Sequence, residues 1–128
     1  MIFVDASYII ALVLENDKWH ERALTLMDDL VKEDKVITHA MIIETINLIG
    51  KCKGGKVGKT IFQYIKDNYL IFNKDYILDK AMKEYIKYDG KISLADSTAI
   101  ITMKKLNIHQ IYSFDSDFDK ISTFQRVF

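Results

Sequence analysis

The chain has 128 residues, of which 49% are hydrophobic and 28% are charged, as in a typical soluble globular protein. This length suffices to bury one hydrophobic core, so we expect a single domain over residues 1–128. The 18 basic and 18 acidic residues cancel, so the overall charge predicts no anionic partner. The sequence has neither an apolar run of membrane-spanning length nor a signal-peptide pattern, and we therefore expect a cytoplasmic protein.

Cys52 is the only cysteine of the chain. A lone cysteine excludes an intramolecular disulfide and a metal site built from several cysteines. We expect Cys52 to be a small buried apolar residue, because free cysteines usually pack in this way. The three histidines, at positions 20, 39 and 109, lack the spacing of a zinc site.

The first part of the chain alternates between short apolar runs and amphipathic segments. Residues 1–5 are rich in β-forming residues and predict a buried strand, followed by a helix over about 8–14. Apolar residues at helical spacing from Trp19 to Val31 predict an amphipathic helix in which Trp19 belongs to the core. Residues 35–38 then predict a short strand, and residues 40–51 predict a third helix.

The most basic short stretch follows this third helix and contains no acid. It comprises Lys51, Lys53, Lys56 and Lys59, interleaved with glycines. We expect a solvated loop, and the alternative is a rim that faces the phosphates of RNA. A P-loop at residues 58–60 is rejected, because the motif requires a glycine where this sequence has Lys53.

The remaining elements continue the alternation of helices and strands. We expect helices over about 59–68, 78–88 and 92–105, and strands at 70–72, 110–113 and 123–128. This order, without hairpin signals, predicts an α/β fold with a mainly parallel sheet and helices on both faces. In such a sheet, ligands bind beyond the carboxyl ends of the strands.

Three acids stand alone in otherwise uncharged or apolar segments. Asp5 directly follows the first predicted strand, Glu44 lies in the third helix, and Asp96 falls on the apolar side of the helix over 92–105. A buried carboxylate is costly unless it is paired, hydrogen-bonded or holding a cation. Each acid also has a structural alternative, namely a helix cap for Asp5, a half-exposed helix position for Glu44, and a capping box with Ser93 for Asp96.

A group of acids follows the strand predicted at 110–113. Asp115, Asp117 and Asp119 alternate there with Phe114, Ser116 and Phe118. We expect at least one of the three to be an ordinary surface acid. By connectivity, Asp5, Glu44, Asp96 and Asp115 can all converge on the carboxyl edge of the sheet.

Convergence of four carboxylates predicts a metal site. Two carboxylates about 4 Å apart repel each other by roughly 4 kcal/mol at an effective dielectric of about 20, so a cluster either stays partly protonated or binds cations. Oxygen ligands without histidine or cysteine select Mg²⁺ or Mn²⁺. A carboxylate-held Mg²⁺ suits hydrolysis of a phosphodiester, because it activates water and stabilises the leaving oxygen.

Four short motifs occur in order along almost the whole chain, namely Val4-Asp-Ala-Ser7, the isolated Glu44, Leu94-Ala-Asp96 and Ser113-Phe-Asp-Ser-Asp-Phe118. In order and spacing they resemble the PIN-domain ribonucleases, in particular the VapC-type toxins of toxin–antitoxin pairs. The resemblance implies a three-layer α/β/α sandwich with a parallel central sheet and a Mg²⁺-dependent endoribonuclease. It also implies a homodimer held inactive by a small antitoxin protein.

The resemblance further implies a role for each matching residue. The family's catalytic acidic quartet is matched by Asp5, Glu44, Asp96 and Asp115. Of these, Asp5, Asp96 and Asp115 are the expected metal ligands. Asp117 matches a further acidic position that varies in the family, and it is expected as an additional metal residue with a secondary role. Ser7 matches a hydroxyl residue that supports the site by hydrogen bonding. Ser97 departs from the pattern, because alanine is frequent at this position.

Two alternatives to an endoribonuclease remain open at this stage. One is a non-catalytic PIN-fold module that binds RNA or a protein, although four crowded carboxylates offer such a module no evident advantage. The other is a DNA-directed nuclease with the same metal site. No residue pattern in the sequence reads the 2′-hydroxyl, so competition between RNA and DNA substrates would separate these two nucleases.

Overall fold

A computed structural model describes all residues, 1–128. Its centre is a five-stranded sheet in which every neighbouring pair of strands is parallel. The strands are β1 (Ile2–Val4), β2 (Lys35–Thr38), β3 (Tyr69–Phe72), β4 (Gln110–Tyr112) and β5 (Gln125–Val127), in the order β3-β2-β1-β4-β5. Strand β1 is central, since Phe3 pairs with Val36 of β2 on one side and with Ile111 of β4 on the other. All three residues of β1 are buried.

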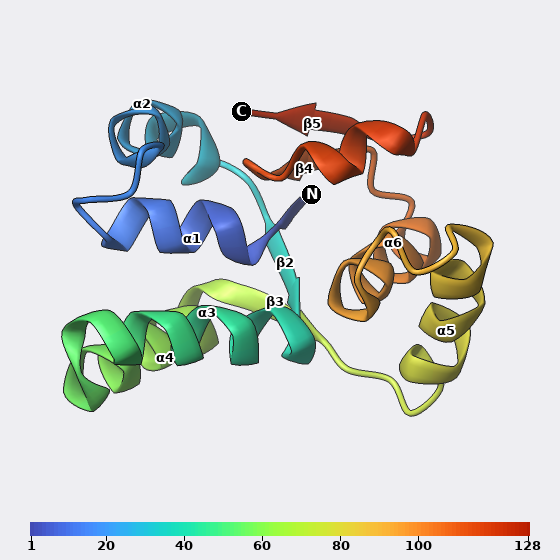
Figure 1. The fold of residues 1–128 in the computed structure, drawn as a ribbon. Coiled ribbons are helices and arrows are strands. Elements are labelled where there is room, and N and C mark those ends of the chain that lie inside the picture. The colour runs from blue at the N-terminus through green and yellow to red at the C-terminus, as the bar shows by residue number, and fades with distance from the viewer.

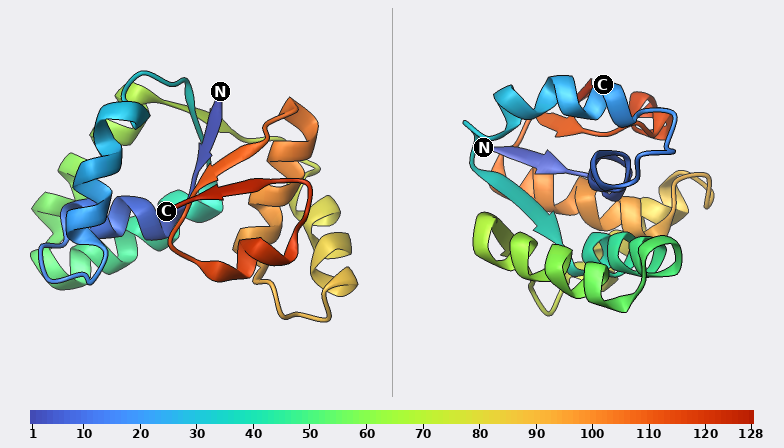
Figure 2. Two further views of the ribbon diagram at one scale, coloured as in Figure 1. Left: turned by 90° about the horizontal axis from the view of Figure 1, so that it is seen from above. Right: turned by 90° about the vertical axis from the view of Figure 1, so that its left-hand side faces the viewer.

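Helices cover both faces of the sheet. Figure 1 shows four of them on one side, namely α1 (Ala6–Val13), α2 (His20–Leu30), α3 (His39–Lys53) and α4 (Gly55–Asn68). On the other side lie α5 (Ile77–Lys87), α6 (Leu94–Leu106) and the short 3₁₀ helix η1 (Ser116–Lys120), as the view from above also shows (Figure 2). The fold is therefore a three-layer α/β/α sandwich, and the predicted fold class is confirmed.

One continuous cluster of 28 buried hydrophobic residues joins the three layers. It contains the strand residues Phe3, Val4 and Ile111 together with Met41 of α3 and Ile100 of α6, all with no exposed surface. Burial on both faces explains why these strands are continuous apolar runs rather than alternating patterns. None of the helices combines the length and apolar character that a membrane crossing requires.

The carboxyl ends of the strands lead into the helices that carry the candidate residues. Asp5 ends β1 and caps α1, Thr38 ends β2 and caps α3, and Asp115 follows β4 and caps η1. Because Asp5 is the cap, α1 begins at Ala6, two residues before the expected start. All three caps lie at the same edge of the sheet, since the strands are parallel.

The structure contradicts two expectations in the middle of the chain. The stretch of Lys51 to Lys59 is not a loop, because Lys51 and Lys53 form the last turn of α3 and α4 begins at Gly55. A single residue, Gly54 with φ of +91°, separates the two helices. This left-handed conformation lets the chain reverse at one glycine, so no loop is needed.

The burial expected for Cys52 is also wrong. Cys52 is exposed on α3, and the buried positions of this helix are Met41, Ile42, Thr45 and Ile49. The helical register would place Cys52 on the same side as Ile49, but Cys52 lies in the last turn of α3, where residues 51–56 are all exposed because this end of the helix extends beyond the core. The composition of the segment alone does not reveal this.

Candidate metal centre and active site

A pocket of about 560 Å³ opens at the carboxyl edge of the sheet. Its walls come from the start of α1, the loop before α2, the middle of α3, the start of α6 and the segment after β4. Six carboxylates line it, those of Asp5, Asp17, Glu44, Asp96, Asp115 and Asp117. The acids predicted from the sequence are therefore brought together in one place.

Asp5 is held by two hydroxyl groups. Its Oδ2 accepts hydrogen bonds from Ser7 Oγ and, at 2.8 Å, from Ser113 Oγ. The same two hydroxyls accept the backbone N–H groups of Phe114 and Asp115, each at 3.0 Å. This network ties the end of β1 to the segment after β4, and it leaves Oδ1 of Asp5 without a hydrogen-bond partner in the protein.

Asp96 lies in the first turn of α6 and is 7% exposed. Ser93 caps this helix, and its Oγ accepts the Asp96 backbone N–H at 3.0 Å. The reciprocal bond of a full capping box, from the Ser93 N–H to the Asp96 carboxylate, is absent, so the carboxylate remains free to face the pocket. Two residues further along the helix, the hydroxyls of Thr98 and Thr38 form a hydrogen bond of 3.1 Å and fix α6 against the end of β2.

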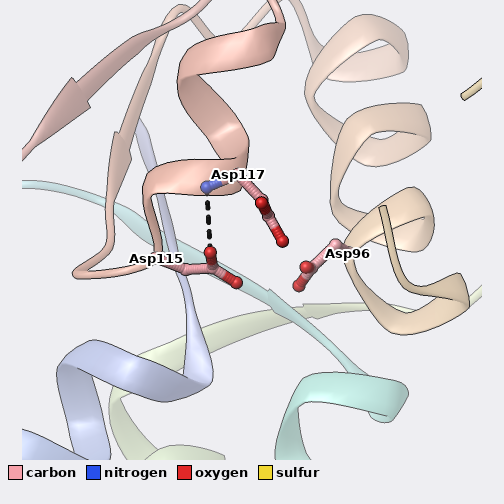
Figure 3. A group of neighbouring side chains, drawn as sticks. All are labelled: Asp96, Asp115 and Asp117. Carbon is pink, nitrogen blue, oxygen red and sulfur yellow. Dashed lines mark hydrogen bonds between the residues drawn. The ribbon is translucent and has the colours of Figure 1, made fainter. Parts of the chain in front are cut away.

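Asp96, Asp115 and Asp117 form the tightest group of acids in the pocket. Each offers a carboxylate oxygen, and these oxygens lie within 4.8 Å of one another. Figure 3 shows the three side chains pointing toward one another from α6 and from the start of η1. The Asp117 N–H donates to Asp115 Oδ1 at 2.9 Å, which sets the distance between these two acids. Asp115 and Asp117 are close together in the sequence, whereas Asp96 comes from a different element, so the fold brings the three acids together.

Burial and mutual repulsion raise the pKa values of three acids in the pocket. Burial, reinforced by the charges of Asp5, Asp115 and Glu44, raises the pKa of Asp96 from 3.8 to about 8. Burial also raises the pKa of Asp5, against the hydrogen bonds from Ser7 and Ser113 that lower it. The pKa of Glu44 is raised by partial burial and by the charges of Asp5 and Asp115, although solvent still reaches its side chain.

The donor set fits a divalent cation of the Mg²⁺ or Mn²⁺ type. All of the converging side chains offer oxygen, and no histidine or cysteine lines the pocket. Lys120 pairs with Asp117 at 2.9 Å, but no lysine or arginine forms an ion pair with Asp5, Asp96 or Asp115. Asp5 and Asp96 are therefore buried carboxylates without a counter-ion, and a hard cation would stabilise them.

Some residues do not lie where the sequence suggested a role. Lys51, Lys53, Lys56 and Lys59 are not part of this pocket, and Lys53 instead lines a neighbouring cavity and pairs with Glu15 at 3.6 Å. Their contact with RNA therefore stays a prediction.

Other residues of the pocket were missed or read differently from the sequence. Asp17 and Lys91 line it without belonging to any motif. Trp19, expected in the core, does pack against the core but also forms part of the pocket wall. Ser113 was part of the matched motif, and its hydroxyl could have been suspected because it directly precedes the acids.

Comparisons with known proteins identify the family and support the fold. A sequence model described as the PIN domain matches residues 2–123, and the chain therefore belongs to the PIN domain family. Its fold is similar to the crystal structure of Mycobacterium tuberculosis VapC20, a sarcin-ricin loop cleaving toxin, with a TM-score of 0.86, 22% identity, and 99% and 98% of the two chains covered. It is also similar to FitAcB from Neisseria gonorrhoeae, with a TM-score of 0.68, 16% identity, and 100% and 97% covered. No curated protein matches the chain significantly.

Proposed function

We propose that this chain is a Mg²⁺- or Mn²⁺-dependent endoribonuclease that hydrolyses phosphodiester bonds and serves as the toxin of a toxin–antitoxin system. The observation that carries the proposal is the convergence of Asp96, Asp115 and Asp117 within 4.8 Å in a pocket where Asp96 is buried without a counter-ion. Membership of the PIN domain family supports it. So does the similar fold of VapC20, which is described as a toxin that cleaves the sarcin-ricin loop.

Asp96, Asp115 and Asp117 would hold the cation. Asp5, whose Oδ1 has no hydrogen-bond partner in the protein, lines the same pocket. When bound, a divalent cation supplies an activated water and charge stabilisation for the leaving oxygen. Ser7 and Ser113 keep the Asp5 carboxylate in one orientation through their hydrogen bonds to Oδ2.

Glu44 has a separate position in the same pocket, on α3, and it does not belong to the tight group. Its raised pKa makes it a better proton acceptor than an ordinary glutamate. In the proposed reaction Glu44 either completes the ligand set or orients the attacking water. No histidine or cysteine lines the pocket, so in the proposed reaction water is the attacking group.

Metal binding is the first test of this proposal. Mn²⁺ and Mg²⁺ are titrated against the wild type, Asp96→Asn and Asp79→Asn, with binding followed by calorimetry and stabilisation by thermal melting. Asp79 is an exposed acid of α5 outside the pocket and provides the matched control. We expect saturable binding in the wild type and Asp79→Asn, and binding at least about tenfold weaker in Asp96→Asn.

Substrate class is tested on the same proteins. A mixed pool of structured RNAs is digested with Mg²⁺ or Mn²⁺, in competition with single-stranded and duplex DNA. Metal-dependent RNA cleavage that Asp96→Asn abolishes supports the ribonuclease, and preferred cleavage of DNA would replace it with a DNA nuclease. Metal binding without cleavage of any nucleic acid would favour a non-catalytic module.

We also infer a homodimer and a small antitoxin partner from the same resemblance. Light scattering after gel filtration measures the mass of the purified chain, and a mass near 14.9 kDa would contradict the dimer. Co-expression with the product of a small adjacent gene should yield a stable complex in which RNA cleavage is suppressed.

A further inference from the structure

We propose that the acidic pocket contains a nucleotide-binding subsite, in which Lys91 binds a phosphate of a single-stranded nucleic acid and Trp19, backed by Phe114, stacks against a base. All three residues line the pocket together with the carboxylates. The inference rests on the proposed nuclease function and deepens it, because it names the side chains that hold the substrate.

Lys91 is the only basic residue that lines this pocket. Although six carboxylates share the same walls, its ammonium group forms neither an ion pair nor a hydrogen bond with any of them. The side chain is exposed and ready to meet a ligand. A nucleic-acid phosphate beside several carboxylates needs a cation to approach, and a lysine at the rim supplies one in addition to any metal ion.

The backbone around Lys91 is arranged to place this lysine at the pocket. Two residues with left-handed backbone conformations follow the end of helix α5, namely Asp89 with φ of +52° and Gly90 with φ of +71°. Hydrogen bonds from the Gly90 and Lys91 N–H groups to the carbonyls of Tyr85 and Tyr88 hold this turn. The next residue, Ile92, is completely buried, so the chain is anchored directly beside the lysine.

The aromatic wall is a stack of three rings from three parts of the chain. Tyr8 of α1 is buried, and Phe114 lies 5.9 Å from it at an angle of 25°. Trp19 lies 4.9 Å beyond Phe114 and is nearly parallel to it, at 4°. The stack therefore runs from the core to a partly exposed indole at the pocket. The backbone N–H of Trp19 donates a hydrogen bond of 2.8 Å to Asp17 Oδ1, which fixes the backbone at Trp19.

A rigid aromatic ring beside a phosphate-binding cation is the usual combination for binding single-stranded nucleic acid. A base can stack on a protein ring only after it leaves its own helical stack, and single strands and loops offer such bases. The pocket volume of about 560 Å³ lies within the range of small-ligand sites, which suits one nucleotide and not a duplex. Phe114 stacks on the Trp19 ring at 4.9 Å, and the Lys18 ammonium lies over the same ring, 5.5 Å from its centre. A base that stacks on Trp19 therefore displaces this exposed lysine side chain.

Binding can be measured through the protein itself, because Trp19 is the only tryptophan of the chain. The probe is a mixed-sequence single-stranded RNA of about ten nucleotides, a length in the range of single-strand binding sites. Its phosphorothioate linkages slow hydrolysis, and gel electrophoresis after each titration checks that it stays intact. Its binding in Mg²⁺ is followed by Trp19 fluorescence and by the anisotropy of a label on the RNA. We expect the bound RNA to change the Trp19 emission and a duplex of the same sequence to bind more weakly.

The variants separate a substrate contact from a merely structural role. Lys91→Gln should weaken binding about tenfold and lower the slope of log affinity against log salt by about one, whereas Lys91→Arg should restore both. Lys83→Gln is the matched control, because Lys83 is an exposed lysine of α5 outside the pocket. Trp19→Phe should keep most of the affinity, and Trp19→Ala should lose about tenfold.

The outcomes distinguish this inference from the proposed function. If the RNA binds in a manner that depends on Lys91 and Trp19 but no nucleic acid is ever cleaved, the subsite stands and the nuclease proposal fails. If cleavage depends on Asp96 while Lys91→Gln and Trp19→Ala bind and cleave as the wild type does, the subsite is wrong. Tighter binding of the duplex, or no binding of the single strand, would equally overturn it.

Discussion

At the scale of single residues, the acids of the pocket raise the free energy of the folded protein in the absence of a cation. Asp96 is the clearest case, because it is 7% exposed and has no counter-ion. Asp96→Asn removes the charge while keeping the shape of the side chain. We expect nuclease activity to fall by at least about a hundredfold, while the metal-free free energy of unfolding at pH 8 rises by roughly 2 kcal/mol.

Urea denaturation in EDTA and the RNA cleavage rate measure the two effects of Asp96→Asn. Asp79→Asn, at an exposed acid outside the pocket, should leave the cleavage rate unchanged and should lower the free energy of unfolding by about 0.5 kcal/mol, because Asp79 lies in the first turn of α5. Asp96→Asn protein that is less stable than the wild type at pH 8 would contradict the repulsion among the acids.

The pKa of Asp96 also predicts how stability varies with pH. The folded protein keeps a proton on Asp96 up to about pH 8, whereas the unfolded chain releases it near 3.8. Between these values the folded state binds more protons, so the contribution of Asp96 to stability is greatest below pH 4 and is lost as pH rises toward 8. Urea midpoints in EDTA should fall over this window, and more steeply in the wild type than in Asp96→Asn.

Ser113 holds two acids at once, because its Oγ donates to Asp5 Oδ2 and accepts the Asp115 N–H. Ser113→Ala leaves the Asp115 N–H without its partner at a fully buried position, and it removes one of the hydrogen bonds to Asp5, which keeps those from Ser7. We expect a loss of about 1–3 kcal/mol in the free energy of unfolding and a further rise in the pKa of Asp5. Chemical denaturation and NMR titration of Asp5 measure these changes, with the exposed Ser116→Ala as the neutral control.

At the scale of elements, the turn between α5 and α6 forms the part of the pocket wall that contains Gly90 and Lys91. Gly90 has φ of +71°, and a Cβ there would lie 3.1 Å from the Tyr85 hydroxyl. Gly90→Ala should therefore cost about 1–2 kcal/mol, through the left-handed backbone and the close contact. It should also displace the neighbouring Lys91 and weaken the binding of the RNA probe.

Gly50 provides the opposite case within the same chain. It lies inside α3, and a Cβ at this position would meet nothing within 4 Å. Gly50→Ala should stabilise the protein by about 0.5–1 kcal/mol, because alanine loses less entropy in a helix. Thermal melting of the two variants compares them directly, and the same sign of change in both would refute this account of the turn.

At the scale of the whole molecule, the formal net charge of zero conceals a strong local imbalance at the carboxyl edge of the sheet. A divalent cation that binds only the folded state should raise its stability by about 2.7 kcal/mol at a hundred times the dissociation constant. We expect this gain to be larger at pH 8 than at pH 6, because metal binding must displace the proton of Asp96. Melting temperatures in Mn²⁺ that do not depend on pH would contradict the assignment of Asp96 as a ligand.

The sequence by itself determined the class of fold and the order of its elements. Short apolar runs such as Ile2–Val4 and Val36-Ile37 predicted the strands, because a strand buried on both faces leaves a continuous apolar signature. The motifs around Asp5, Asp96 and Asp115 predicted the PIN-domain resemblance, which the family match confirms. These signals are local in the chain, so a reader of the sequence can find them.

Only the tertiary structure decided how the site is assembled. It placed Asp117 with Asp96 and Asp115 in the tight group, and it showed that the Asp96 carboxylate does not complete a capping box. It also brought Lys91 and Trp19 to the same pocket from different connections. The packing of the helices and the parallel pairing of the strands bring these residues together, and their spacing in the sequence does not predict it. The roles of the individual acids therefore stay predictions for the experiments on metal and RNA.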